Sequence, residues 1–264
     1  MQSFSRISGR FSRVSAWFPA FVLLSLLLAI WEILALLHPD ALLPGPIGVA
    51  RGIRDLLQHG LLFKYVVASL FRVTWGFGLA VILAIPLGMI IGWYGRLDQA
   101  LNPLIQILRP ISPLAWIPIA ILWFGVGDLS AIFLIFLGSF FPLVLTSMNA
   151  VRSVPEIYIR AGRNFGLNAF QLFYRVLYPA ILPQIIVGLR ITLGVAWLVV
   201  VAAEMIAVNS GLGFLIVDAR NAGNRYDLVV SGMLLIGVIG LVLDSGLRSL
   251  ERMDSARWDY GGGE

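Results

Sequence analysis

Apolar residues gather along this chain in long windows that short polar stretches separate. A helix that crosses a bilayer core of about 30 Å needs about 20 mostly apolar residues. Six windows of this kind can be read from the sequence, at residues 18–37, 66–91, 105–123, 131–148, 184–207 and 228–250. The pattern predicts an all-α integral membrane protein with six transmembrane helices, organised as one membrane domain over residues 1–264.

The composition agrees with a membrane protein. Hydrophobic residues make up 59% of the 264 residues, charged residues make up 12%, and the mean hydropathy is +0.91. These values exceed what a soluble core of this length buries. The first window is long for a signal peptide and no small-residue cleavage site follows it, so we expect a retained span.

The basic residues predict an orientation, because loops on the cytoplasmic side carry an excess of arginine and lysine. Successive loops lie on alternate sides of the membrane. The loops and tails on one side contain Arg6, Arg10, Arg13, Arg96, Arg152, Arg160, Arg163, Arg175, Arg248, Arg252 and Arg257. The loops on the other side contain fewer basic residues: Arg51, Arg54, Lys64, Arg220 and Arg225. We therefore expect both termini to be cytoplasmic. The net charge of +5 reflects this bias, and no binding of nucleic acid is predicted.

Small residues recur at every fourth position of the second window: Gly76, Ala80, Ala84, Gly88 and Gly92. Such a stripe lets another helix backbone approach closely in the membrane. The partner helix can belong to a second subunit or to the same chain. The sequence leaves both alternatives open.

Prolines interrupt the third window in the stretch LRPISPLAWIPIAILWFG. Each proline removes a backbone donor and clashes with the preceding turn, so the helix must kink or break. Broken backbone at membrane depth is tolerated where it lines a water-filled cavity or is buried in protein. Pro113, Trp116 and Pro118 are therefore candidates for the wall of a translocation path, and a kinked, packed helix is the alternative.

Ionisable residues within the windows are costly and need partners. Matching depths along the predicted helices suggest two pairs, Glu32 with Arg72 and Arg190 with Asp244. Fixed ion pairs are one interpretation of these charges. A wall of the path is another, because Arg190, Trp197 and Glu204 recur at intervals of seven and share one helix face.

The sequence shows no catalytic constellation. Its two histidines, His38 and His59, both fall in one loop, and neither a metal-ligand cluster nor a phosphate-binding loop is present. We therefore expect no enzyme activity, no metal site and no cofactor bound by this chain. Uphill transport would take its energy from a partner or from an ion gradient.

A polar, aromatic stretch separates the fourth and fifth windows. Ser153 and Glu156 around Pro155 are typical of a capped helix start. Gly166 permits the left-handed turn that ends such a helix. Asn168 can cap a second short helix, which we expect to stop at Pro179. The stretch is thus predicted to form two short helices joined at a glycine elbow, with an exposed aromatic surface that fits a protein partner.

The same stretch, RAGRNFGLNAFQLFYRVLYPAILP, resembles the cytoplasmic EAA loop of ABC-importer permeases. That pattern reads Glu-Ala-Ala, three residues, Gly, nine residues, then Ile-x-Leu-Pro. Here 160–162 stand in the first triplet, Gly166 matches the glycine and 176–179 match the end of the pattern. The departures are Arg160 for Glu, Gly162 for Ala and Tyr178 for Leu, which puts in doubt any salt bridge made by the family's Glu.

Further stretches, among them SLFRVTWGFGLA, PLIQILRPISPLAWIPIAILWFGVGD and GLRITLGVAWLVVVAAEMI, are similar to the nitrate/sulfonate/taurine branch of these permeases. The resemblance implies the type I ABC-importer permease fold, with a coupling helix in the cytoplasmic loop 149–183. It implies that the ATPase is contacted by Arg160, Ala161, Gly162, Arg163, Phe165, Gly166, Asn168, Phe170, Phe173 and Pro179.

The resemblance also implies the partners. They are a second permease copy, giving a homodimer, two ATPase subunits that bind ATP and Mg, and an extracytoplasmic solute-binding protein, all at the bacterial inner membrane with its lipid. The implied cargo is a small anion such as an alkanesulfonate, taurine, nitrate or bicarbonate. Two other functions stay open at this point: a secondary transporter driven by an ion gradient, and an accessory scaffold subunit without a path.

Overall fold

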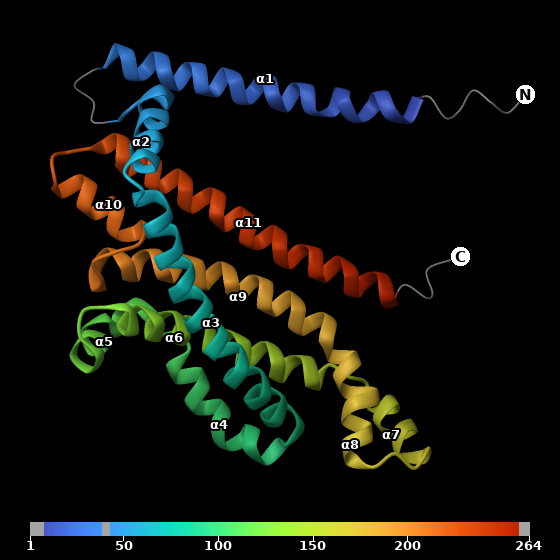
Figure 1. Ribbon diagram of the computed structural model, residues 1–264. Coiled ribbons are helices and arrows are strands. Elements are labelled where there is room, and N and C mark those ends of the chain that lie inside the picture. Colours follow the sequence, from blue (N-terminus) through green and yellow to red (C-terminus); the bar gives the residue numbers. More distant parts are fainter. Residues whose placement is uncertain (1–7, 39–42, 259–264) are drawn as a thin grey trace, which may run out of the picture. The chain divides into compact units, whose positions relative to one another are not determined.

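The computed structural model describes residues 8–38 and 43–258, and every regular element within these ranges is a helix (Figure 1). Along the chain these are α1 (Ser8–Leu37), α2 (Pro46–Gln58), α3 (Leu61–Trp93), α4 (Gly95–Leu108), η1 (Pro113–Trp116), α5 (Ile117–Phe124), α6 (Asp128–Arg152), α7 (Glu156–Asn164), α8 (Ala169–Leu172), η2 (Phe173–Leu177), α9 (Tyr178–Ala207), α10 (Leu212–Asn221) and α11 (Tyr226–Trp258). The all-α prediction is confirmed. Arg6, one of the basic residues from which the orientation was predicted, lies outside the described residues.

The number of helices that could span a membrane is close to the predicted six. Among the described residues α3, α6, α9 and α11 are each long and apolar enough to cross a bilayer. A fifth span is available if α4 and the η1–α5 pair count as one, and the apolar part of α1, residues 21–37, is shorter. The count of six is therefore approximate.

The chain forms two compact units, Met1–Leu62 with Ala219–Ser231, and Phe63–Asp218 with Gly232–Glu264. One membrane domain over 1–264 stays a prediction. In the first unit, Arg225 Nη2 lies 2.9 Å from Asp55 Oδ2 and 2.8 Å from Asp227 Oδ2, and Ser231 Oγ donates to the Val49 carbonyl at 2.9 Å. These contacts join α2 to the start of α11.

In the second unit, α3 packs on α6 through its stripe of small residues. A Cβ on Gly76 would lie 2.7 Å from Ile135 Cβ, and one on Gly92 would lie 2.7 Å from the Met148 carbonyl oxygen. A Cβ on Gly88 would collide with the Val144 carbonyl oxygen. The stripe thus serves packing inside the chain, and the alternative of a subunit interface is wrong for these positions.

The third apolar window is broken, as its prolines predict. Helix α4 ends at Leu108, and residues 110–112 form no helix. The next helix, η1, begins at Pro113, and Ser112 Oγ caps it by accepting from Leu114 N at 3.3 Å. The two halves of this segment differ in direction by 83°. Because Pro113 stands at the first turn of η1, where backbone donors have no helical partner, its missing N–H costs nothing there.

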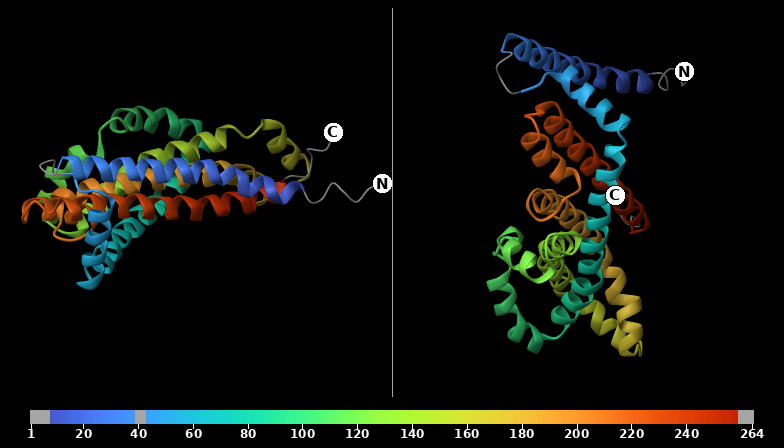
Figure 2. Two further views of the ribbon diagram at one scale, coloured as in Figure 1. Left: turned by 90° about the horizontal axis from the view of Figure 1, so that it is seen from above. Right: turned by 60° about the vertical axis from the view of Figure 1, so that its left-hand side comes forward.

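The polar stretch between α6 and α9 forms what we call the elbow segment, residues 153–177, which contains α7, α8 and η2. Figures 1 and 2 show α7 and α8 projecting beyond the ends of α6 and α9. Two details of the prediction are wrong. Ser153 caps nothing at α7, because its hydroxyl donates to the Ala150 carbonyl at 2.8 Å. Pro179 does not stop the second helix, because the wider π-helical turns of η2 lead directly into α9.

We expect Gly88→Val to destabilise the second unit by about 1–3 kcal/mol, because the added side chain has no room against the α6 backbone. Gly78→Val is the matched control: it lies on the same helix and a Cβ there meets no atom within 4 Å. Thermal unfolding of both variants in detergent checks this. Equal midpoints for the two variants would show that the stripe does not set the packing of α3.

Candidate functional site

The elbow segment turns at Gly166, as its sequence predicts. Gly166 has φ of 76°, and its N–H donates to the Arg163 carbonyl at 2.9 Å. Leu167 N then donates to the Gly162 carbonyl at 3.1 Å, which satisfies a second carbonyl at the end of α7. An L-residue with a Cβ rarely adopts this φ, so glycine suits the corner between α7 and α8.

The second arm of the elbow segment starts with a reciprocal cap. Asn168 Oδ1 accepts from Gln171 N at 2.8 Å, and Gln171 Oε1 accepts from Asn168 N at 3.1 Å. Both bonds satisfy donors that the short helix α8 leaves unpaired. The predicted role of Asn168 as a cap is confirmed.

The outward side of the elbow segment is aromatic and basic. Phe165 is 85% exposed and Phe170 is 71% exposed. Arg160 and Arg163 are also exposed, and Arg160 Nη2 lies 2.9 Å from Glu156 Oε2 one turn earlier. Large aromatic side chains exposed together are typical of a surface that binds a partner.

The inward side of the elbow segment packs tightly. Gly162 is buried, and a Cβ there would lie 2.6 Å from Leu172 Cδ1, so this glycine lets α7 lie against α8. Ala161 and Phe173 are half-buried. Leu177 joins an apolar cluster with Val151 from α6. The elbow segment is thus packed against the helices that flank it.

An ion cluster around the buried side chains of Arg72 and Glu204 holds α3, α6 and α9 together at their ends opposite the elbow segment. Arg72 is 1% exposed and Glu204 is 0% exposed, and Arg72 Nη1 lies 2.6 Å from Glu204 Oε1. Arg72 Nη2 lies 2.7 Å from Asp128 Oδ1 and donates to Ser210 Oγ at 2.6 Å. Ser69 Oγ donates to the second Glu204 oxygen at 2.9 Å.

The predicted pair of Glu32 and Arg72 is therefore wrong. Arg72 turns to Glu204 and Asp128, whereas Glu32 Oε2 accepts from the Ile47 backbone N–H at 3.2 Å. Depth along a helix does not fix the direction in which a side chain points around it. One signal in the sequence pointed toward Glu204: Ser69 stands three residues before Arg72 on the same helix face, and its hydroxyl donates to the same carboxylate.

The second predicted pair is confirmed. Arg190 Nε donates to Asp244 Oδ1 at 2.7 Å and Nη2 donates to Oδ2 at 3.2 Å, a two-pronged contact between α9 and α11. Trp197 is buried and its Nε1 donates to the Ile236 carbonyl at 3.0 Å. Arg190 and Trp197 line one cavity of about 430 Å³.

Not all candidates for a path wall come together. Glu204 belongs to the Arg72 cluster and does not line the cavity of Arg190 and Trp197. Pro113 packs within reach of α6, since a Cβ on Gly138 would lie 3.2 Å from its Cγ. Trp116 is half-buried and Pro118 is exposed. The path role of these residues stays a prediction.

Comparison with known proteins decides the family. Residues 84–253 match the model of the binding-protein-dependent transport system inner membrane component. The chain belongs to this family of ABC-importer permeases. Members of this family are inner-membrane proteins with several membrane spans.

Individual relatives of this permease cover most of its length. A putative ABC transporter permease of Methanocaldococcus jannaschii is 41% identical over 86% of this chain and 87% of its own. The taurine transport system permease of Escherichia coli is 36% identical over 87% and 86%. The nitrate import permease of a Synechocystis strain is 35% identical over 88% and 87%.

The fold of this permease also matches a solved transporter. A chain from the MetNI methionine ABC transporter, in an inward facing conformation, superposes with a TM-score of 0.65. The match covers 74% of this permease and 96% of that chain at 19% identity. This likeness establishes the fold of an ABC-importer permease.

We expect Arg72→Ala to lower the free energy of unfolding by about 3–5 kcal/mol, because it leaves the Glu204 carboxylate buried without a partner. Replacing both residues by Met should restore part of this loss. Arg225→Ala is the control, since this arginine lies in an exposed cluster and exposed pairs contribute about 0–1 kcal/mol. Thermal unfolding in detergent gives the comparison, and a double variant no more stable than Arg72→Ala would contradict the pairing.

Proposed function

We propose that this chain is the membrane-spanning subunit of an ATP-driven importer of a small anion. Its elbow segment projects from the helices that flank it and exposes Phe165 and Phe170, and this observation carries the proposal. A partner ATPase would bind this surface and pull on α6 and α9, which continue directly from the elbow segment. The relatives named for taurine and for nitrate support an anion as the cargo.

The assembly that follows has two copies of this chain, two ATPase subunits and an extracytoplasmic solute-binding protein. ATP and Mg would bind to the ATPase, so this chain has no ATPase activity of its own. The elbow segment would be cytoplasmic, and the six spans predicted from the sequence would place both termini on that same side. Within the elbow segment we assign the contact with the ATPase to residues 160–173.

Arg160 gives the elbow segment a positive charge at the position where the family pattern has glutamate. Because Glu156 lies one helical turn earlier and pairs with Arg160, a carboxylate is still present on the same face of α7. The pair is exposed, so it contributes little to stability and is free to exchange for a charge on the ATPase.

Transport in proteoliposomes tests the proposal. Vesicles that hold this chain with its ATPase and its solute-binding protein should accumulate labelled taurine, alkanesulfonate, nitrate or bicarbonate only when ATP is supplied. An ATPase variant that cannot hydrolyse ATP is the control. Uptake that follows an imposed ion gradient and needs no ATPase would instead identify a secondary transporter.

The glycine elbow provides a second test. Gly166→Val should cost about 1–3 kcal/mol of backbone strain and change the aim of α8, so that less ATPase co-purifies. Gly166→Asn is the matched variant, because asparagine tolerates positive φ better than valine does. Asn should therefore retain more ATPase than Val. Normal co-purification and transport with Val would show that the elbow is not needed.

A further inference from the structure

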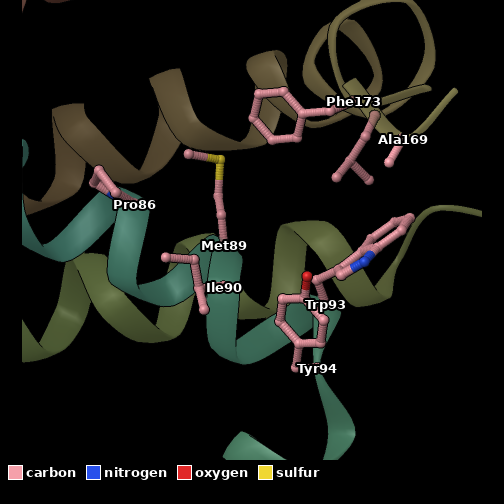
Figure 3. Close-up of a pocket in the computed structure, with 8 residues that line it drawn as sticks. Pro86, Met89, Ile90, Trp93, Tyr94, Ala169 and Phe173 are labelled. Carbon is pink, nitrogen blue, oxygen red and sulfur yellow. The ribbon is translucent and has the colours of Figure 1, made fainter. Parts of the chain in front are cut away.

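An apolar cavity lies between the end of α3 and the second arm of the elbow segment. It measures about 360 Å³ and is lined by Pro86, Met89, Ile90, Trp93, Tyr94, Ala169, Phe173 and Leu177. Figure 3 shows Met89 reaching from α3 toward the helix that carries Phe173. All eight residues belong to the second unit.

The chemistry of the lining selects an apolar ligand. None of the eight side chains carries a charge, and their only side-chain polar groups are the Trp93 indole N–H and the Tyr94 hydroxyl. An apolar cavity holds water poorly, because water needs two to four polar partners. The volume falls within the range of about 300–1,000 Å³ that is usual for small-molecule sites.

The position of the cavity along α3 points to lipid. Helix α3 is apolar enough to span a bilayer, and its apolar stretch ends at Trp93 and Tyr94, aromatic residues of the kind that mark the membrane–water interface. One and two turns before the cavity, α3 exposes Leu83 and Leu79, and it also exposes Ile82 and Ile90. These exposed residues form an apolar strip that continues into the cavity at Ile90.

One basic residue stands close in sequence to the lining residues of each wall. Arg96 follows Tyr94 by two residues, Arg175 lies between Phe173 and Leu177, and both arginines are exposed. Exposed arginines near the membrane–water interface attract the phosphate of membrane lipids. A ligand with an apolar tail and an anionic head therefore fits better than a tail alone.

The wall opposite α3 is the point where the elbow segment joins α9. Phe173 and Leu177 begin and end η2, the π-helical stretch that precedes Pro179. Single π-helical turns are frequent at functional sites, and their wider turn leaves room beside the helix. A ligand in the cavity would thus touch α3 and the joint of the elbow segment at once.

We propose that this cavity binds one acyl chain of a membrane phospholipid, whose phosphate lies at the level of Arg96 and Arg175. The bound chain fills the space between α3 and η2 and holds the elbow segment against the membrane helices. Its effect on transport rests on the proposed function. The binding itself does not, so labelling of the chain tests it separately.

Photolabelling of the purified protein in lipid nanodiscs provides the test. The probe is an anionic phospholipid with a diazirine on one acyl chain, and labelled peptides are mapped by mass spectrometry. We expect adducts on Phe173 and Leu177 as well as on Met89. Labelling confined to the exposed strip of α3, with none on η2, would overturn the proposal whatever the variants do.

Two variants separate the cavity from general contact with lipid. Met89→Trp places a larger side chain in the cavity and should lower labelling of η2 by roughly tenfold, the size of effect that a filled apolar pocket produces. Leu83→Trp is the control on the exposed strip and should leave labelling of η2 unchanged. Equal labelling of η2 in both variants would contradict the assignment.

Two further labelling experiments identify the molecule that occupies the cavity. A diazirine diacylglycerol, which has the same acyl chains but no phosphate, should label η2 less than the phospholipid does, and stronger labelling by the diacylglycerol would overturn the choice of phospholipid. Addition of the ATPase should leave the labelling of η2 in place. Its loss on assembly would show that the cavity is a contact with the ATPase and not a lipid site.

Discussion

A guanidinium group buried in an apolar interior must be neutralised and fully hydrogen-bonded, and the second unit is arranged around this requirement at Arg72. The group reaches Glu204 on α9 and Asp128 at the start of α6, and it also bonds both oxygens of Ser210. If any one of these partners were removed, a buried charge or hydrogen-bond donor would lose its partner where water cannot replace it. Three helices are therefore fixed to one another at the ends opposite the elbow segment.

The elbow segment occupies the other ends of α6 and α9. It is continuous with both helices and packs on them through buried residues such as Leu172 and Leu177, while its outward aromatic residues have no cover within the described part of the chain. Between the two ends, the glycines of α3 bring its backbone against α6. A force applied to the elbow segment would therefore reach the whole group of helices.

The sequence predicted those features that depend on local rules. The break at the prolines of the third window, the positive φ of Gly166 and the cap at Asn168 each follow from the chemistry of one or two residues. The partners of Arg72 could not be predicted in this way, because they come from helices 56 and 132 residues away, and their rotation about the helix axis is set by packing. The continuation of α9 through Pro179 was missed because π-helical turns have no clear sequence signature.

Cross-linking in native membranes tests whether this chain couples to an ATPase through the elbow segment. The sequence contains no cysteine, so a single cysteine at Phe165 can carry a short thiol-reactive cross-linker without background. We expect a covalent product with the ATPase from this position and none from a cysteine at Leu83 on the exposed strip of α3. A product from Leu83 and none from Phe165, in membranes that contain the assembled transporter, would contradict it.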